Sequence, residues 1–174
     1  MYLISLYFDA KADHMIHNYM SLIARQSEND FMIQNQVPAH LTLLSFDHIE
    51  ENRAIELFNK VSFQTGRLEV MSFGVLPSRA IYLAPLYNDY LHNLLKDFYY
   101  AFSMEGSVHF SQYYRPDRFL PHITVGKTLK QNQMEKACNA MIYTFTPFEL
   151  KVCKIELASN HPFRVLAQKK IPEL

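Results

Sequence analysis

Two stretches of the chain carry the same pattern of potentially catalytic residues. The sequence PAHLTLL places Thr42 two residues after His40, and the sequence LPHITVG places Thr124 two residues after His122. Side chains two residues apart lie on the same face of a β-strand, whereas in a helix they point to nearly opposite sides. If both stretches are strands, each histidine therefore shares a face with its threonine.

Two such pairs supply the groups that cleavage of a phosphodiester needs. A histidine titrates near neutral pH, so two imidazoles flanking one phosphorus can act as general base and general acid, each worth about 10² to 10⁴ in rate. A threonine hydroxyl can donate a hydrogen bond to a phosphate oxygen as charge develops there. One pair alone is a weak signal, because a half-buried histidine often lies beside a strand-forming residue. Two pairs, each preceded by a proline, predict a catalytic site.

Hydrophobic patterning predicts strands at both pairs and a mixed chain around them. Strands are expected at residues 2–9, 40–46, 67–75, 79–85, 121–127, 148–158 and 161–169. Helices are expected, each from an apolar stripe, at residues 11–28, 49–61, 87–104 and 129–143. Residues 107–119 are expected to form an irregular polar loop, and Pro77 and Ser78 to form a turn.

The order of these elements repeats along the chain. Each histidine strand is followed by a helix and then by two strands, although the two halves share little sequence identity. The repeat predicts a single domain over residues 1–174, made of two similar lobes at about 1–86 and 87–174, with exchange of a strand between lobes possible in principle. The predicted fold class is α+β.

Charge and glycine content narrow the range of partners. Lys+Arg and Asp+Glu number 17 each, so the chain lacks the positive excess that a broad nucleic-acid surface needs. A small phosphorylated substrate or the end of an RNA strand remains compatible with this balance. The chain has four glycines and no glycine-rich phosphate loop, which argues against an ATP-dependent ligase.

Cysteine content and hydropathy predict a cytoplasmic protein. Cys138 and Cys153 form no CxxC motif, and reduced thiols of an intracellular protein are the expected state. The first ten residues, MYLISLYFDA, do not have the pattern of a signal peptide, and no apolar run has the length of a membrane span. A monomer without membrane attachment is predicted.

No metal site and no cofactor are predicted from the sequence. The chain contains no HExxH, no HxH and no cluster of histidine with cysteine, so metal ligation by His40 and His122 is disfavoured. The other histidines are expected to lie in helices or loops without a functional role, namely His14, His17, His48, His92, His109 and His161.

The two motifs, HLTL at 40–43 and HITV at 122–125, resemble those of the 2H phosphoesterase superfamily, the group of the 2′-5′ RNA ligases and 2′,3′-cyclic phosphodiesterases. The stretches FGVLPSRAIYLAP and RFLPHITVGK are similar in style as well, and the resemblance spans nearly the whole chain. It implies a bilobal fold in which two antiparallel sheets, related by approximate two-fold symmetry, face a central cleft. It also implies metal-independent phosphodiester chemistry at His40, Thr42, His122 and Thr124.

The resemblance implies a class of substrates and leaves three functions open. Substrates of such proteins include 2′,3′-cyclic phosphates on RNA ends or nucleotides, ADP-ribose cyclic phosphate and 2′-5′ linkages. A hydrolase of these bonds is favoured, because binding alone does not need two titrating imidazoles. The alternatives are a 2′-5′ RNA ligase that uses the same cleft and a non-catalytic module that binds RNA ends or nucleotides. Which histidine is the acid is not determined.

Four further residues are candidates for substrate binding. Tyr82 shares a strand face with two alanines, which leaves space for a base or sugar to stack on its ring. Arg115 and Arg118 precede the second motif and are placed to guide an anionic strand. Lys127 stands where many members of the family have arginine, but in a regular strand it would face away from His122. Leu44 replaces a frequent lysine after the first motif.

Overall fold

The computed structural model describes residues 1–77 and 79–171 of the chain. The described helices are α1 (Ala10–Ser27), α2 (Phe31–Gln34), α3 (Glu51–Lys60), α4 (Asp89–Ser103) and α5 (Gln131–Thr144), with a short 3₁₀ helix, η1 (Gln112–Tyr114). The strands are β1 (Tyr2–Phe8), β2 (Leu41–Asp47), β3 (Gly66–Leu76), β4 (Ala80–Pro85), β5 (His109–Phe110), β6 (Ile123–Gly126), β7 (Phe148–Asn160) and β8 (Phe163–Lys170).

Every strand and helix predicted from the sequence is present, with ends that differ by a few residues. Three short elements were not predicted: α2, and the elements β5 and η1 inside the expected loop at 107–119. Elements of two to four residues are too short to show a period in their apolar residues, so their pairing in space is what defines them. The predicted turn includes Ser78, which lies outside the described residues.

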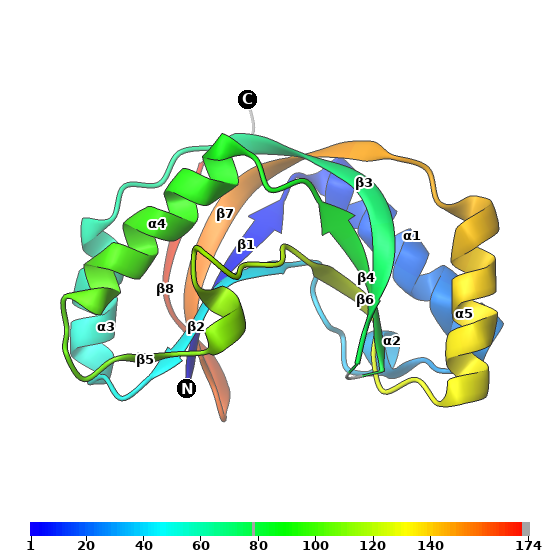
Figure 1. Cartoon of the computed structure of the whole chain (residues 1–174), viewed down its shortest axis with the longest axis horizontal. Helices are drawn as coiled ribbons and strands as arrows, with labels where there is room; N and C mark the ends of the chain where they lie inside the picture. Colours follow the sequence, from blue (N-terminus) through cyan, green and yellow to red (C-terminus); the bar gives the residue numbers. More distant parts are fainter. Residues whose placement is uncertain (78, 172–174) are drawn as a thin grey trace.

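The strands form one antiparallel sheet of eight, in the order β5-β2-β1-β7-β3-β4-β6, with β8 also paired to β7. The α+β class is confirmed. Strand β7 pairs with β1 on one side and with β3 on the other, so the two sheets expected from the resemblance are two wings of one continuous sheet. Figure 1 shows this sheet as an arch.

Each half of the chain supplies strands to both wings. Strands β1 and β2 lie in one wing and β3 and β4 in the other, although all four come from the N-terminal half. Strand β7, from the C-terminal half, lies between β1 and β3. The lobes expected at about 1–86 and 87–174 therefore interleave in space, and the division of the chain into lobes at residue 86 stays a prediction.

Helices cover the two ends of the arch as separate groups. Helices α3 and α4 pack together at one end, and α1, α2 and α5 gather at the other (Figure 1). Helix α1 begins where the Asp9 carboxylate accepts a hydrogen bond from the backbone N–H of Ala12, and it buries an apolar stripe that includes Ile16, Met20 and Ile23. Within the described ranges, no helix combines the length and the apolar character that crossing a membrane needs.

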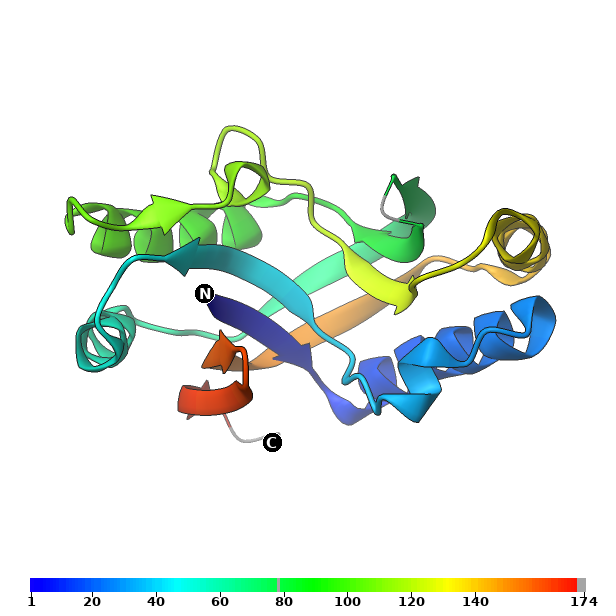
Figure 2. The same cartoon turned by 90° about the horizontal axis from the view of Figure 1, so that it is seen from below.

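The curl of the sheet brings β2 and β6 close together although they belong to different wings. The two strands are not neighbours in the hydrogen-bonded order, yet their backbones approach each other. Seen from below in Figure 2, the start of the cyan β2 lies close to the yellow β6. Since His40 immediately precedes β2 and His122 immediately precedes β6, this approach is what places the two motifs in one region.

Candidate functional site

The structure holds His40 and His122 by the same backbone contact. The Nδ1 atom of His40 lies 2.8 Å from the carbonyl oxygen of Pro38, and the Nδ1 atom of His122 lies 2.8 Å from that of Leu120. A carbonyl oxygen only accepts hydrogen bonds, so Nδ1 must donate in both residues. Each ring is therefore fixed in the tautomer that leaves Nε2 available to accept a proton or, once protonated, to donate one.

The strand register shifts at the same place in each motif. Between the pairs Ile4 with Leu44 and Ser5 with Thr42, β2 has one extra residue, Leu43. Strand β6 has one extra residue, Val125, between the pairs Ile81 with Gly126 and Tyr82 with Thr124. A bulge of this kind bends the strand and interrupts the alternation of its side chains. The fourth residue of both motifs is thus the bulged one.

The bulge and the end of β6 remove the reason to expect that Lys127 faces away from His122. Without it, alternation along the strand would turn Lys127 away from the face that carries His122 and Thr124. One extra residue at Val125 reverses that alternation, and β6 ends at Gly126. Burial is the largest cause of the lowered pKa of His40, and the positive charge of Lys127 lowers it further.

The two threonines lie beside different neighbours across the sheet. Thr42 pairs in register with Ser5 and is buried, with 9% of its surface exposed. Thr124 pairs in register with Tyr82 and is half-buried. In both motifs the residue between the histidine and the threonine, Leu41 or Ile123, is buried in the core.

A tyrosine from the neighbouring strand lies against each histidine. The ring centroids of Tyr7 and His40 are 6.2 Å apart, and those of Tyr82 and His122 are 5.9 Å apart. Tyr82 lies across Gly74 of β3, where a Cβ atom would come within 2.5 Å of its hydroxyl oxygen, so glycine is what lets the ring lie there. Tyr114, from η1, adds a third ring at 6.2 Å from His122.

The surroundings of His40 lower the pKa of its ring. Burial is the largest cause, because it disfavours the charged imidazolium, and the positive charges of His122 and Lys127 act in the same direction. The Pro38 carbonyl and the Glu156 carboxylate oppose this shift. The two histidines are therefore within electrostatic reach of each other, and the neutral form of His40 is favoured.

A buried carboxylate lies on the His40 side of the site. Glu156, in β7, is 7% exposed, and its Oε1 accepts a hydrogen bond from Lys154 Nζ at 2.8 Å. The Lys154 ammonium also lies 4.0 Å from the centroid of the Tyr7 ring. Burial raises the pKa of Tyr7, and its hydrogen bond to Glu156 raises it further. Lys154 and Glu156 thus connect β7 to Tyr7, whose ring contacts His40.

The sequence prediction missed Tyr7, Tyr114, Lys154 and Glu156. Lys154 and Glu156 are two of four charged residues in the strand expected at residues 148–158, so their charge alone did not single them out. Their proximity to His40 depends on the pairing of β7 with β1, where Tyr7 lies opposite Lys154. No local pattern in the sequence predicts that pairing.

Of the four residues predicted to bind substrate, two lie near the histidines and two lie in an exposed loop. Tyr82 lies against the His122 ring, and Lys127 is close enough to His40 to lower the pKa of its ring. Arg115 and Arg118 are exposed in the loop between η1 and β6, and the Nε atom of Arg118 is 3.8 Å from Asp117 Oδ2. No described contact joins either arginine to His40 or His122, so their part in guiding a substrate stays a prediction.

A possible metal ligand set lies apart from the two motifs. Among the described residues, the group of histidine and carboxylate side chains close enough to share an ion consists of Asp47, His48 and His109. It includes neither His40 nor His122. At the motifs, the donor set of two imidazoles and two hydroxyls is instead suited to proton transfer and to hydrogen bonding with a phosphate.

Comparison with known proteins identifies relatives of this fold. A family model described as the 2′-5′ RNA ligase superfamily matches residues 21–162. The crystal structure of E. coli LigT complexed with 3′-AMP superposes with a TM-score of 0.64 at 16% sequence identity, covering 99% of this chain and 98% of that one. The structure of E. coli LigT complexed with NADP⁺ gives a TM-score of 0.57 at 15% identity, with coverage of 99% and 97%. No curated protein matches the chain by sequence.

Proposed function

Because the chain belongs to the 2′-5′ RNA ligase superfamily, we propose that it is a phosphoesterase that hydrolyses a 2′,3′-cyclic phosphate on an RNA end or nucleotide, or a 2′-5′ phosphodiester. The observation that carries this proposal is the matched fixation of His40 and His122. Both rings donate from Nδ1 to a carbonyl at 2.8 Å, which leaves both Nε2 atoms available for proton transfer. Two rings fixed in this way suit paired acid and base catalysis better than passive binding.

His40 is the proposed general base. A base must be neutral before the reaction, and the lowered pKa of His40 favours its neutral form at neutral pH. In the proposed first step, His40 Nε2 removes a proton from a water molecule as the water oxygen attacks the phosphorus. The new bond joins the water oxygen to phosphorus.

His122 is the proposed general acid. In its protonated form it donates the Nε2 proton to the ribose oxygen as the bond between that oxygen and phosphorus breaks. If the 3′ oxygen leaves, the product of a cyclic phosphate is a 2′-phosphate. One proton is taken from water and one is delivered to the leaving oxygen, so the two rings end in exchanged protonation states and return by exchange with solvent.

Thr42 and Thr124 are the proposed donors to the phosphate oxygens that bear charge in the transition state. Each threonine lies in a strand, two residues after the histidine that immediately precedes that strand, and the next residue is the bulged one. Lys127 is proposed to add positive charge near the same oxygens, which its electrostatic effect on His40 supports.

Tyr82 is the proposed platform for a base or sugar. Its ring lies beside His122 and is held over Gly74, so a nucleoside next to the reacting phosphate could stack on it. The complexes of E. coli LigT with 3′-AMP and NADP⁺ support a nucleotide as the kind of ligand to test first.

The experiment that tests this function is hydrolysis of a short RNA ending in a 2′,3′-cyclic phosphate, measured with EDTA present. We expect turnover by the unmodified protein and a loss of about 10² to 10⁴ in rate in both His40→Ala and His122→Ala. His92→Ala, in α4, is the matched control and should keep full activity. The product isomer, resolved by chromatography, identifies the oxygen that leaves.

Two outcomes would contradict the proposal. Binding of the RNA end without turnover, by protein that is folded, would indicate the binding module instead. Joining of RNA ends into a 2′-5′ linkage, without hydrolysis, would indicate a ligase that uses the same residues.

A further inference from the structure

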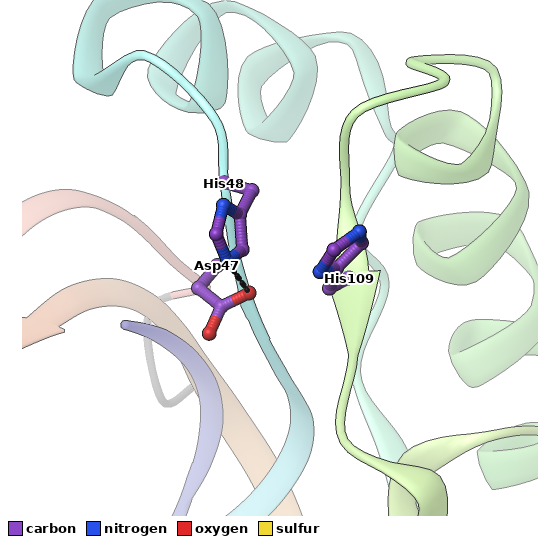
Figure 3. Close-up of side chains that lie close together, drawn as sticks. All are labelled: Asp47, His48 and His109. Carbon is purple, nitrogen blue, oxygen red and sulfur yellow. Dashed lines mark ion pairs between the residues drawn. The ribbon is translucent and has the colours of Figure 1, made fainter.

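Three side chains that could bind a metal ion meet at the far end of β2 from His40. Asp47 is the last residue of β2, His48 follows it, and His109 lies in β5 (Figure 3). The rings of His48 and His109 have centroids 4.4 Å apart, and Asp47 Oδ1 lies 3.4 Å from His48 Nε2. One ligand atom from each residue lies within 4.8 Å of the other two.

Strand pairing and one unusual backbone conformation produce this cluster. Asp47 and His109 lie opposite each other in the pairing of β2 with β5, so their side chains share a face of the sheet. In a continuous strand the next residue, His48, would point to the opposite face. His48 instead has a φ of 57°, in the left-handed region, and its ring returns to the side of Asp47.

One oxygen of the Asp47 carboxylate has no hydrogen-bond partner among the described residues. The Oδ1 atom of Asp47 is shielded from solvent and accepts no hydrogen bond from any described residue. A shielded carboxylate oxygen without a donor is unfavourable, and it calls for a cation or a proton donor. The nearest candidates are the two imidazoles, whose nitrogens are themselves good metal ligands when neutral.

We propose that Asp47, His48 and His109 form a binding site for a divalent transition-metal ion of the zinc type. Two imidazole nitrogens and one carboxylate oxygen are a ligand set that zinc accepts, whereas Mg²⁺ and Ca²⁺ favour oxygen ligands. Metal bonds of about 2.0 to 2.2 Å require the three ligand atoms to move closer together. His48 has 63% of its side chain exposed, so rotation of its ring is not blocked by packing.

Room for the remaining ligands exists beside the cluster. A surface pocket of about 190 Å³ is lined by Asp47 and His109, together with Ser45 and Ser111. Water molecules can complete the coordination there, which gives an open site with three protein ligands. An open site of this kind binds the ion less tightly than a closed site with four protein ligands.

The bound ion would join two segments that are far apart in the sequence. His109 belongs to the segment that continues through η1 to His122, and in the protein alone this segment is tied to β2 by the short pairing of β5 and by the bond from Ser111 N to Ser45 O. Metal bonds from β5 to the end of β2 would strengthen this attachment. The site is separated from His40 by the length of β2, roughly 20 Å for seven residues, so it is distinct from the proposed reaction.

The test is titration of the chelator-treated full chain with Zn²⁺, followed by calorimetry and by the thermal midpoint, Tm. We expect one Zn²⁺ per chain at micromolar concentration and a rise in Tm of several degrees, with no rise for Mg²⁺. The variants are His109→Ala, Asp47→Asn and His48→Asn, the last chosen because asparagine tolerates a left-handed backbone. Each should weaken zinc binding at least tenfold.

The control is His14→Ala, which removes an exposed histidine from α1 and should bind Zn²⁺ like the unmodified protein. Circular dichroism of each variant without metal establishes that the fold is kept. Absence of zinc binding to the unmodified chain would overturn the proposal. So would equal affinities in all variants, or equal losses in His14→Ala and His109→Ala, since both results indicate binding by scattered surface histidines.

Discussion

The His40 and His122 regions have the same local geometry but different neighbouring side chains. In both, the ring is fixed by a carbonyl two residues earlier, a tyrosine lies against it, and a bulge follows the threonine. Around His40, however, the neighbours include the buried Glu156 and its partner Lys154. Around His122 the neighbours are the rings of Tyr82 and Tyr114.

Two motifs with the same local geometry can acquire different roles through contacts made by other strands. Backbone contacts within a few residues set the orientation of each ring, and these are duplicated. Burial lowers the pKa of His40, and the charges of His122, Lys127 and Glu156 adjust it. The proposed assignment of His40 as base and His122 as acid rests on that second set of contacts.

The largest expected effect is a difference between His40→Ala and His122→Ala that depends on the leaving group of the substrate. On a 2′,3′-cyclic phosphate, both His40→Ala and His122→Ala should lose about 10² to 10⁴ in kcat/KM. On a nucleoside 4-nitrophenyl phosphodiester, whose leaving group departs as a stable anion, a general acid contributes little. His122→Ala should then recover most of its activity, whereas His40→Ala should not.

Steady-state rates of the four combinations of variant and substrate check this assignment. Recovery by His40→Ala in place of His122→Ala would reverse the roles of the two residues. Equal losses on both substrates would show that neither histidine acts mainly on the leaving group.

A smaller effect concerns the two hydroxyls. Thr42→Val and Thr124→Val keep the branched shape but remove the donor, and each should lower kcat by about 10² to 10³, as for other donors to a charged transition state. Thr42→Ser and Thr124→Ser, which keep the hydroxyl, should retain most of the activity. Single-turnover rates distinguish this loss from weaker substrate binding, and equal rates in the valine and serine variants would exclude a donor role.

The smallest effect is a displacement of the pH profile. The base must be deprotonated, so kcat/KM falls as the pH drops through the pKa of His40, which lies below the ordinary value of about 6.5. Glu156 raises that pKa, so Glu156→Gln should move the acidic limb to lower pH. Lys127 lowers it, so Lys127→Gln should move the limb to higher pH.

The opposite directions of these two shifts are the decisive feature. A change in substrate binding alters the height of the profile, whereas a change in the pKa of His40 alters its position. Profiles of kcat/KM from pH 4.5 to pH 8 would show it. Shifts in the same direction, or unchanged limbs, would mean that a group other than His40 governs the acidic limb.

Local spacing in the chain predicted the strands that carry the two threonines. The spacing of His40 with Thr42 and of His122 with Thr124, together with apolar residues between them, predicted the two strands that the structure contains as β2 and β6. The shared face of each histidine and its threonine stays a prediction. Apolar patterning predicted every long element. These features follow from the two-residue period of a strand and the 3.6-residue period of a helix, which are local properties of the chain.

The residues that face the two motifs from neighbouring strands are set by the pairing of the strands in three dimensions. The bulge at Val125, the pairing that puts Lys154 opposite Tyr7, and the meeting of His48 with His109 all depend on strand register. Register is fixed by how the whole sheet buries its apolar face, and a shift of one residue would send each side chain to the other side. Such contacts join residues far apart in the sequence, so no local spacing predicts them.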